Sequence, residues 1–122
     1  MAITNITLGF VSGLAVHVNT DVDESEDDVA AAAGTLYQIQ IDNTGNAAVT
    51  YVKLYDAGAA AVTVGTTAPD WIFRVAASVS RTIPFPEGAA FATALSVAAL
   101  TAGGTAGTTG PTSAVTVRIV YA

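Results

Sequence analysis

Six of the chain's ten acidic residues stand in one short run near its N-terminal end, where they form its densest set of oxygen ligands. Calcium prefers oxygen ligands, and Asp21, Asp23 and Ser25 have the alternate spacing of the first half of an EF-hand loop. The pattern then fails, because Glu26 stands where that loop needs glycine and Ala32 where it needs the closing glutamate. Blocks of like charge usually stay solvated and extended, so we expect a loop, with a weak calcium site completed by another chain as the alternative.

His17 is the single histidine of the chain. A metal centre built from several histidines is therefore excluded, and any catalytic triad would have to use this residue. Because it alternates with Val16 and Val18, we expect it on the solvent face of a strand rather than in the role of a general base. The chain has no cysteine, which excludes disulfides and thiolate sites.

Four acids outside the acidic run are candidates for the carboxylate pair of a glycosidase, in which one carboxyl group donates a proton and the other is base or nucleophile. They stand at strand ends or in turns, where acids usually serve the turn: Asp42, Asp56, Asp70 and Glu87. No feature of the sequence distinguishes two of them as a pair. We therefore predict that the chain is not an enzyme and has no catalytic residue, cofactor or bound metal.

Trp71 is the single tryptophan, and it follows Asp70 and precedes Phe73 and Arg74. Aromatic and polar side chains in this order suggest a platform for carbohydrate. A large aromatic residue is more often part of a core or an interface, and this is the interpretation that we favour.

The composition is typical of a single thin β domain. A length of 122 residues suffices for one core and is too short for two. Alanine raises the hydrophobic fraction to 52% while aromatics supply only 7%, which suits a two-layer sandwich better than a large globule. The apolar stretches are far shorter than the about 20 residues of a membrane span, and the N-terminus lacks the basic region of a secretory signal. The net charge of −6 arises from the acidic run at 21–28, so nucleic acid is a poor partner.

Short segments rich in Val, Ile and Thr, separated by turn residues, predict about eight strands. The clearest is 36–42, where apolar and polar residues alternate, and the others are 3–10, 14–19, 49–56, 61–64, 71–75, 79–85, 91–100 and 113–121. Between the predicted strands 14–19 and 36–42, the alanine run at 29–34 predicts a helix of little more than one turn.

Turn residues predict how some of these strands are connected. Asn43-Thr44-Gly45-Asn46 predicts a hairpin between 36–42 and 49–56, and the loop at 65–70 predicts a change of sheet. Pro84 and Pro86 predict either an edge strand or the end of the strand, because proline cannot donate a ladder hydrogen bond. We also expect the face of 49–56 that carries Tyr51, Lys53 and Tyr55 to be partly buried.

The expected fold is all-β: an antiparallel β-sandwich or jelly-roll-like barrel of about eight strands with an extended N-terminal segment. Residues 1–34 are expected to form an arm or hairpin with the acidic loop, and residues 35–122 the sandwich domain. A Gly-Thr-Thr-X-Pro turn occurs twice, at 65–69 and 107–111, which predicts two neighbouring loops at one end. Neither turn has the lysine and following helix of a phosphate-binding loop.

Several segments of the second region together carry a family resemblance. They run from Thr35-Leu36-Tyr37 through Ile41-Asp42-Asn43-Thr44, then Val49 to Asp56, Val64 to Asp70, Pro86 to Phe91 and Ala102 to Val117. In order and spacing, over residues 35–122, this pattern resembles small structural proteins of tailed bacteriophages. It is a pattern of strands and turns, so it fixes no functional residue.

The resemblance implies a non-enzymatic component of the virion. We expect a capsid decoration or cement protein that lies on the capsid surface and stabilises the head by binding the lattice of the major capsid protein. Such a protein is expected to be a homo-oligomer, with a trimer favoured, and to bind neither nucleic acid nor membrane. A tail or fibre component and a carbohydrate-binding β-sandwich module are the alternatives.

Overall fold

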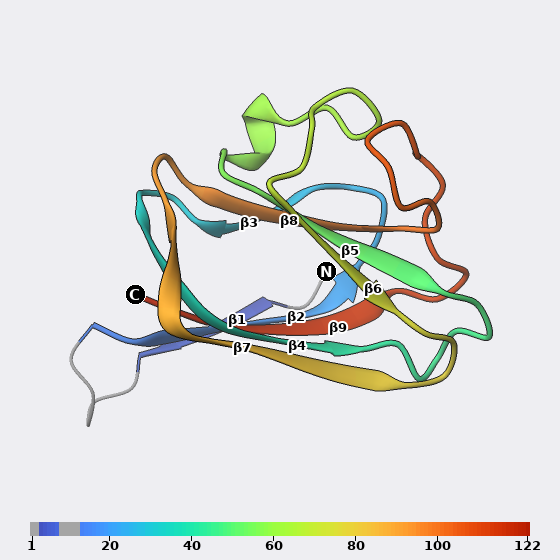
Figure 1. Cartoon of the computed structure of the whole chain (residues 1–122), viewed down its shortest axis with the longest axis horizontal. Coiled ribbons are helices and arrows are strands. Elements are labelled where there is room, and N and C mark those ends of the chain that lie inside the picture. Colours follow the sequence, from blue (N-terminus) through green and yellow to red (C-terminus); the bar gives the residue numbers. More distant parts are fainter. Residues whose placement is uncertain (1–2, 8–12) are drawn as a thin grey trace.

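The computed structural model describes residues 3–7 and 13–122. Within them, nine β-strands and one 3₁₀ helix form two antiparallel sheets that pack face to face as a β-sandwich (Figure 1). The predicted all-β antiparallel sandwich is confirmed, and the sheets do not close into a barrel. The elements are β1 (Ile3–Thr7), β2 (Ala15–Val22), β3 (Asp27–Ala30), β4 (Gly34–Asp42), β5 (Thr50–Tyr55), η1 (Ala59–Ala61), β6 (Trp71–Val75), β7 (Ser80–Phe91), β8 (Leu95–Leu100) and β9 (Val115–Tyr121).

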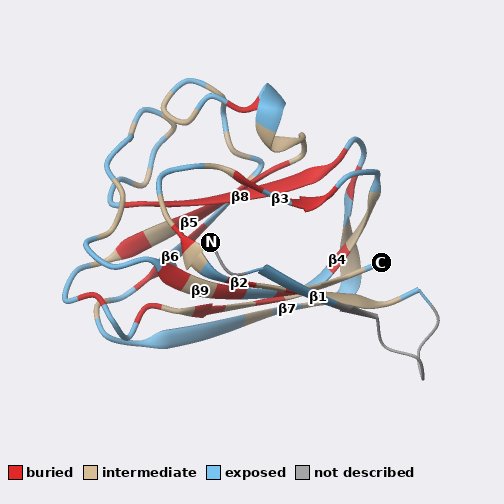
Figure 2. Cartoon of the chain, turned by 180° about the vertical axis from the view of Figure 1, so that it is seen from behind, coloured by how far each residue is buried: buried red, intermediate tan, exposed pale blue. Residues whose placement is uncertain are grey.

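Sheet A contains five strands in the order β1-β2-β9-β4-β7, and sheet B contains four in the order β3-β8-β5-β6. β6 and β7 are therefore free edges on one side of the sandwich, and β1 and β3 are free edges on the other. Figures 1 and 2 view the sandwich from these two sides. Pro84 and Pro86, which predict an edge strand, do lie in the edge strand β7.

The core lies between the two sheets, where alternate residues of each strand point inward. Ile39 and Ile41 of β4 and Ile119 of β9 share this layer with Val52 and Leu54 of β5, and all five side chains are completely buried. Figure 2 shows buried residues on both sheets. Because the burial of one such side chain contributes about 1.5–3 kcal/mol, this shared layer holds the sheets together.

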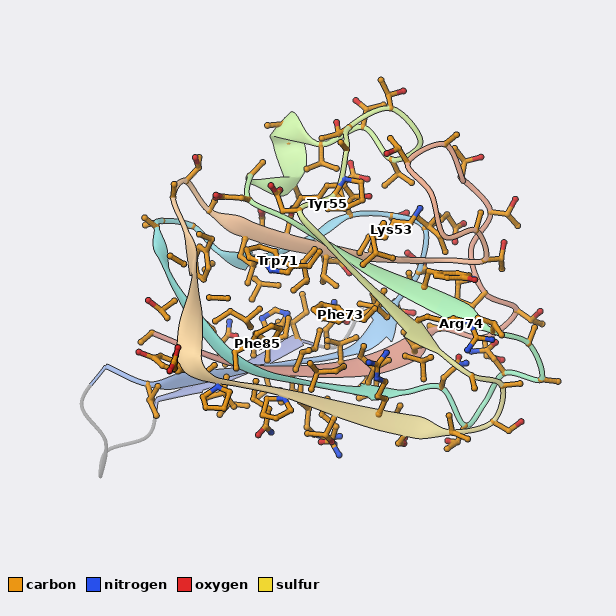
Figure 3. The ribbon with its side chains drawn as sticks, in the orientation of Figure 1. Lys53, Tyr55, Trp71, Phe73, Arg74 and Phe85 are labelled. Atoms are coloured by element: carbon orange, nitrogen blue, oxygen red, sulfur yellow. The ribbon has the colours of Figure 1, made fainter. Side chains whose placement is uncertain are left out.

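Side chains also join the two free edges β6 and β7 across the gap between the sheets. Phe73 of β6 and Phe85 of β7 make an edge-to-face contact with ring centroids 6.0 Å apart. Trp71 is half-buried and packs against the same core, and Figure 3 shows the three rings between the sheets. Near the other end of β6, Arg81 Nη1 donates to the carbonyl oxygen of Arg74 at 2.7 Å.

The first 34 residues, expected as an arm or hairpin with an acidic loop, contribute strands to both sheets. β1 and β2 form the predicted first hairpin, with Asn5 opposite His17. The predicted first strand extends to Phe10, and its part at 8–10 lies outside the described residues. β2 also pairs with β9, and β3 pairs with β8, so two further strand pairings join this segment to the rest of the sandwich.

The helix predicted at 29–34 is wrong. Its first two residues belong to β3, in which Asp27 lies opposite Val97 and Ala30 opposite Leu95. The helical preference of alanine over other ordinary residues is at most about 0.7 kcal/mol per residue, and a single turn is costly to nucleate. Strand pairing, with burial of Ala30 and its neighbours against the core, outweighs that preference.

The turn that begins at Asn43 carries the chain from sheet A to sheet B, so the predicted hairpin between β4 and β5 is wrong. Asn43 is completely buried, and its Nδ2 donates to the carbonyl oxygens of Ala48 at 3.1 Å and Ala76 at 3.0 Å. Its Oδ1 accepts from Asn46 Nδ2 at 2.9 Å and from Thr50 Oγ1 at 2.8 Å. These hydrogen bonds hold a corner at which the chain passes from one sheet to the other, whereas the sequence predicts a hairpin turn within one sheet.

The long connection at 56–70 joins β5 to β6, which are neighbours in sheet B. The change of sheet predicted at 65–70 is therefore wrong. The strand predicted at 61–64 is not formed either, because Ala59–Ala61 is the 3₁₀ helix η1 and Val62 is buried against Tyr55 on the outer side of sheet B.

This connection and the loop at 101–114 together cover the outer face of sheet B (Figure 1). Lys53 and Tyr55, expected on a partly buried face, are completely or almost completely buried beneath them. Lys53 Nζ donates to the carbonyl oxygen of Gly104 in the covering loop. The same cover explains why all six residues of β8 are buried.

The two Gly-Thr-Thr-X-Pro turns are neighbours, as predicted. A Cβ atom on Gly65 of the first turn would lie 2.5 Å from Thr108 Cγ2 of the second. Gly65 also has a φ of 91°, in the region that favours glycine. The close approach of the two turns therefore depends on the absence of a side chain at this position.

Candidate functional site

No loop of the described residues covers the outer face of sheet A, in contrast to that of sheet B (Figure 1). The side chains that point outward from β2, β9, β4 and β7 are half-buried by their neighbours or exposed. We call this surface the open face, and it consists of Val16, Val18, Gln38, Gln40, Asp42, Ser80, Thr82, Pro84, Thr116, Arg118 and Val120.

The strand register arranges the open face in three rows: Val16-Val120-Gln38-Pro84, Val18-Arg118-Gln40-Thr82 and Thr116-Asp42-Ser80. The first row is mainly apolar, and the other two are mainly polar. The whole outer face of sheet A, which includes β1 beside the open face, has five strands spaced about 4.8 Å apart; with about eight residues a strand and a rise of about 3.4 Å per residue, it measures roughly 24 Å by 27 Å. A standard-sized protein interface buries about 800 Å² per partner, so this face is of the right order for one.

The open face is electrically neutral, because Asp42 and Arg118 are its only ionisable members. Asp42 Oδ1 accepts hydrogen bonds from Thr44 Oγ1 at 2.6 Å and from Thr44 N at 2.9 Å. These two bonds, with smaller contributions that include the charge of Arg118, hold the pKa of Asp42 below its ordinary value. The amides, hydroxyls and half-buried valines of the open face are groups that bind another surface rather than react with a substrate.

The four acids considered as a glycosidase pair lie at the end of β4, in turns or on the edge strand β7. Asp56 accepts the backbone N–H groups of Ala92 and Thr93 at 2.8 Å each, and these bonds lower its pKa. Asp70 accepts from the backbone nitrogen of Asp56 at 2.7 Å. The carboxyl group of a general acid needs a raised pKa, and neither Asp42 nor Asp56 has one. Glu87, the fourth, is exposed on β7.

Trp71 belongs to the core, as favoured over the carbohydrate platform. It is half-buried against the core, and Phe73 is buried in contact with Phe85. Arg74 is exposed, and because side chains alternate along β6 it points to the face opposite to that of Trp71 and Phe73. Trp71, Phe73 and Arg74 therefore do not share one exposed surface.

His17 is completely buried, so the solvent-face position predicted for it is wrong. The register places His17 opposite the core residue Ile119, whereas Val16 and Val18 belong to the open face. His17 Nδ1 lies 2.9 Å from Asn5 Oδ1, and Nε2 has no hydrogen-bond partner. Alternation in the sequence indicates a period of two, but not which set of residues points inward.

The acidic run is divided among the end of β2, a turn and β3. Glu24 and Asp28 are exposed, as a solvated loop predicts, but Asp27 is buried and accepts from Asn19 Nδ2 at 2.8 Å. Burial raises the pKa of Asp27. Among the described residues, no group of three or more His, Cys, Asp or Glu side chains is placed to hold a metal ion. A calcium site completed by another chain stays a prediction.

One surface pocket of about 290 Å³ lies beside the β3–β4 connection. Its lining is mainly methyl groups and aromatic rings, from Val29, Ala30, Ala31, Ala32, Ala33, Phe91, Tyr121 and Ala122. Cofactor sites combine an apolar lining with a few placed polar or charged groups. Tyr121 is the one polar side chain in this lining.

Comparison with known proteins assigns the chain to no family: no family model, no curated protein and no solved structure matches it. Within residues 3–7 and 13–122, no helix is long and apolar enough to cross a membrane. The surfaces of the sandwich are therefore the features of the structure that bear on function.

Sequence reasoning did not identify the open face. The alternation of Gln38 and Gln40 with Ile39 and Ile41 does predict one solvent face on this strand. What the alternation cannot indicate is that β4 lies between β9 and β7, because those strands are distant in the sequence. A surface formed by four strands becomes visible only once their pairing is known.

Proposed function

We propose that this chain is a non-enzymatic structural protein of a phage virion, and specifically a capsid decoration or cement protein that binds the lattice of the major capsid protein. The open face is the observation that carries this proposal. A decoration protein needs a broad, neutral underside that lies across capsid subunits, and it needs no reacting group. The resemblance of residues 35–122 to small structural proteins of tailed phages supports the same class.

The contrast between the two outer faces supports an orientation on the capsid. The loop at 101–114, which covers sheet B, contains only Gly, Ala, Thr, Pro and Ser and therefore carries no charge. Short neutral polar residues of this kind tolerate exposure to solvent. In the proposed arrangement sheet A faces the head, and the covered side of sheet B faces outward.

The proposal includes a homo-oligomer, with a trimer favoured. One open face is no larger than a single ordinary interface. The affinity of an interface of this size can be as low as micromolar, because it depends on the quality of the contacts and not on the area. Copies joined around a symmetry axis bind as a unit, because each contact raises the effective concentration of the next. An oligomer that presents several open faces in one direction would thus bind a repeating lattice much more tightly than a single copy.

A charge placed in the open face tests the proposal. Thr82 is exposed in the middle row, and Thr82→Glu would bring an unpaired carboxylate into the interface. Since desolvation of an unpaired polar group costs about 1–3 kcal/mol, we expect binding to phage heads that lack the chain to weaken about tenfold or more. The measurement is co-sedimentation of the purified chain with such heads.

Thr66→Glu is the matched control, because Thr66 is also exposed but lies in the loop over sheet B. It should bind heads as the unaltered chain does. Equal binding by both variants would overturn the assignment of the open face, and an unaltered chain that sediments with tails instead of heads would favour the tail or fibre alternative. A change in Trp71 fluorescence on addition of glycans would favour the carbohydrate-binding alternative.

A further inference from the structure

The side chains of His17 and Asn5 join the edge strand β1 to the sandwich. β1 has one strand neighbour, β2, and His17 lies directly opposite Asn5 in that pairing. His17 Nδ1 and Asn5 Oδ1 are 2.9 Å apart, and the imidazole ring is completely buried. This contact is therefore a partly buried hydrogen bond between the outermost strand of sheet A and the next one.

The chemistry of the contact indicates which tautomer the neutral ring adopts. An amide oxygen only accepts, so Nδ1 must carry the proton, and in a neutral imidazole Nε2 is then a bare acceptor. Nε2 is buried and has no hydrogen-bond partner among the residues that the structure describes. Protonation would add a second N–H group and a positive charge at a position that offers no acceptor, which is costly in a buried site.

The elements packed around His17 offer no neutralising charge in contact with it. Asn5 on β1 is uncharged, and Ile119, the residue opposite on β9, is apolar. On β8 the inward residue Val97 is apolar, and it lies opposite Asp27, the inward acid of β3. The Asp27 carboxylate accepts from Asn19, two residues beyond His17, and burial is the one cause that shifts the pKa of His17.

We propose that His17 is a pH-sensitive latch for the N-terminal strand. At neutral pH the uncharged ring holds β1 through Asn5, and in mild acid its protonation releases β1 from the edge of sheet A. β1 is the strand that detaches because it is outermost and pairs on one side only. Its removal is the smallest change of the fold that brings the ring of His17 to water.

The direction of the pH dependence follows from linkage. Burial lowers the pKa of His17 below its ordinary value of 6.5, so the closed form binds the proton less well than the open form. The stability of the closed form is therefore complete above pH 6.5 and is lost as the pH falls toward the lowered pKa. Between pH 7.5 and 5.5 the open fraction of β1 should rise severalfold, up to about tenfold.

Amide hydrogen exchange of the full chain tests the latch. Protection factors, which correct for the direct effect of pH on exchange, are measured for β1 and for the buried strand β8 at pH 7.5 and 5.5. We expect the protection of the amides in Ile3–Thr7 to fall severalfold from pH 7.5 to pH 5.5. At both pH values these amides should be far less protected than those of β8. The same protection in β1 at both pH values would overturn the proposal, because His17 would then stay buried when β1 opens.

Two further measurements bear on the ring itself. As the single histidine, His17 gives one imidazole signal in a proton NMR titration, and a midpoint at or above 6.5 would overturn the proposal. His17→Gln keeps a neutral donor and acceptor, and it should abolish the pH dependence of β1 protection. Asn5→Ala should weaken β1 at both pH values and keep the dependence. A pH dependence that persists in His17→Gln would assign the effect to another group.

Discussion

Single polar side chains decide where this chain changes sheet. Asn43 accepts and donates four hydrogen bonds below 3.2 Å within one buried corner. Asn46 extends the corner, because its Nδ2 donates to the carbonyl oxygen of Ser113 and its Oδ1 accepts from Ser113 N, each at 2.8 Å. The ends of β4, β5 and β9 are thus held together by two asparagine side chains.

Asn43→Ala should be among the most destabilising single substitutions in the protein. It leaves the donors of Asn46 and Thr50 without their acceptor and two backbone carbonyls without their donor. Each unsatisfied buried group costs about 1–3 kcal/mol, so we expect a loss of about 3 kcal/mol or more in the free energy of unfolding. Urea denaturation followed by tryptophan fluorescence measures it.

Thr44→Ala is the control for this substitution. Thr44 is the next residue, is exposed, and donates its hydroxyl to Asp42 at the surface. Surface substitutions usually change stability little, so its effect should stay within about 1 kcal/mol. Equal losses in the two variants would show that the buried network does not hold the corner.

Alternation of apolar and polar residues along a strand predicts which side chains are exposed only where the side chains that point into the core are the apolar ones. This holds for 38–42, where the isoleucines are buried and the glutamines point outward, but Tyr37, expected on the same face as the isoleucines, is exposed because the register shifts between Leu36 and Gln38. It fails at 15–22, where the valines at 16 and 18 point outward and His17 and Asn19 are buried. Near this edge the interior is polar, with Asn19 bonded to Asp27 and His17 bonded to Asn5, and a pattern based on hydrophobicity cannot reveal that.

At the scale of elements, the sequence predicts the strands better than their partners. Trp71–Val75 and Val115–Tyr121 form as expected, and β7 is the edge strand that its prolines predict. The predicted hairpin after β4 and the predicted change of sheet after β5 are both wrong. In each case the result depends on contacts between residues far apart in the chain, such as Asn43 with Ala76, which local turn propensities do not include.

The bend in β7 depends on one glycine. Gly88 has a φ of 77°, and a Cβ atom there would lie 2.4 Å from Thr35 Cγ2 on the neighbouring strand. Gly88→Ala therefore combines backbone strain with a clash in a packed region, and we expect it to lower the free energy of unfolding by about 2 kcal/mol or more. Thermal or urea unfolding measures the change.

Gly104→Ala is the matched substitution in the loop over sheet B. An added Cβ atom meets nothing within 4 Å, and φ lies outside the positive range that favours glycine. The stability of this variant should stay within about 1 kcal/mol of the unaltered chain, or rise slightly because the unfolded chain loses freedom. If Gly88→Ala were equally harmless, the bend would not require glycine.

For the whole molecule, the two outer faces differ in a way that suits a lattice-binding protein. One face is a bare, neutral sheet surface, and the other carries loops that bury Lys53 and Tyr55 (Figure 3). The free edges β6, β7, β1 and β3 lie along the two sides, between these faces. Contacts between copies through the sides, around an axis perpendicular to the sheets, would leave every open face pointing in the same direction, which is the arrangement that a flat capsid lattice requires.

The most direct test is electron cryo-microscopy of the phage virion to which we propose that the chain belongs. The account predicts ordered density for the sandwich on the head, at symmetry-related positions on the capsid lattice, with sheet A in contact with the major capsid protein and the loops over sheet B facing outward. Density on the tail alone would contradict the capsid assignment. A virion without the chain would contradict a structural role in the particle altogether.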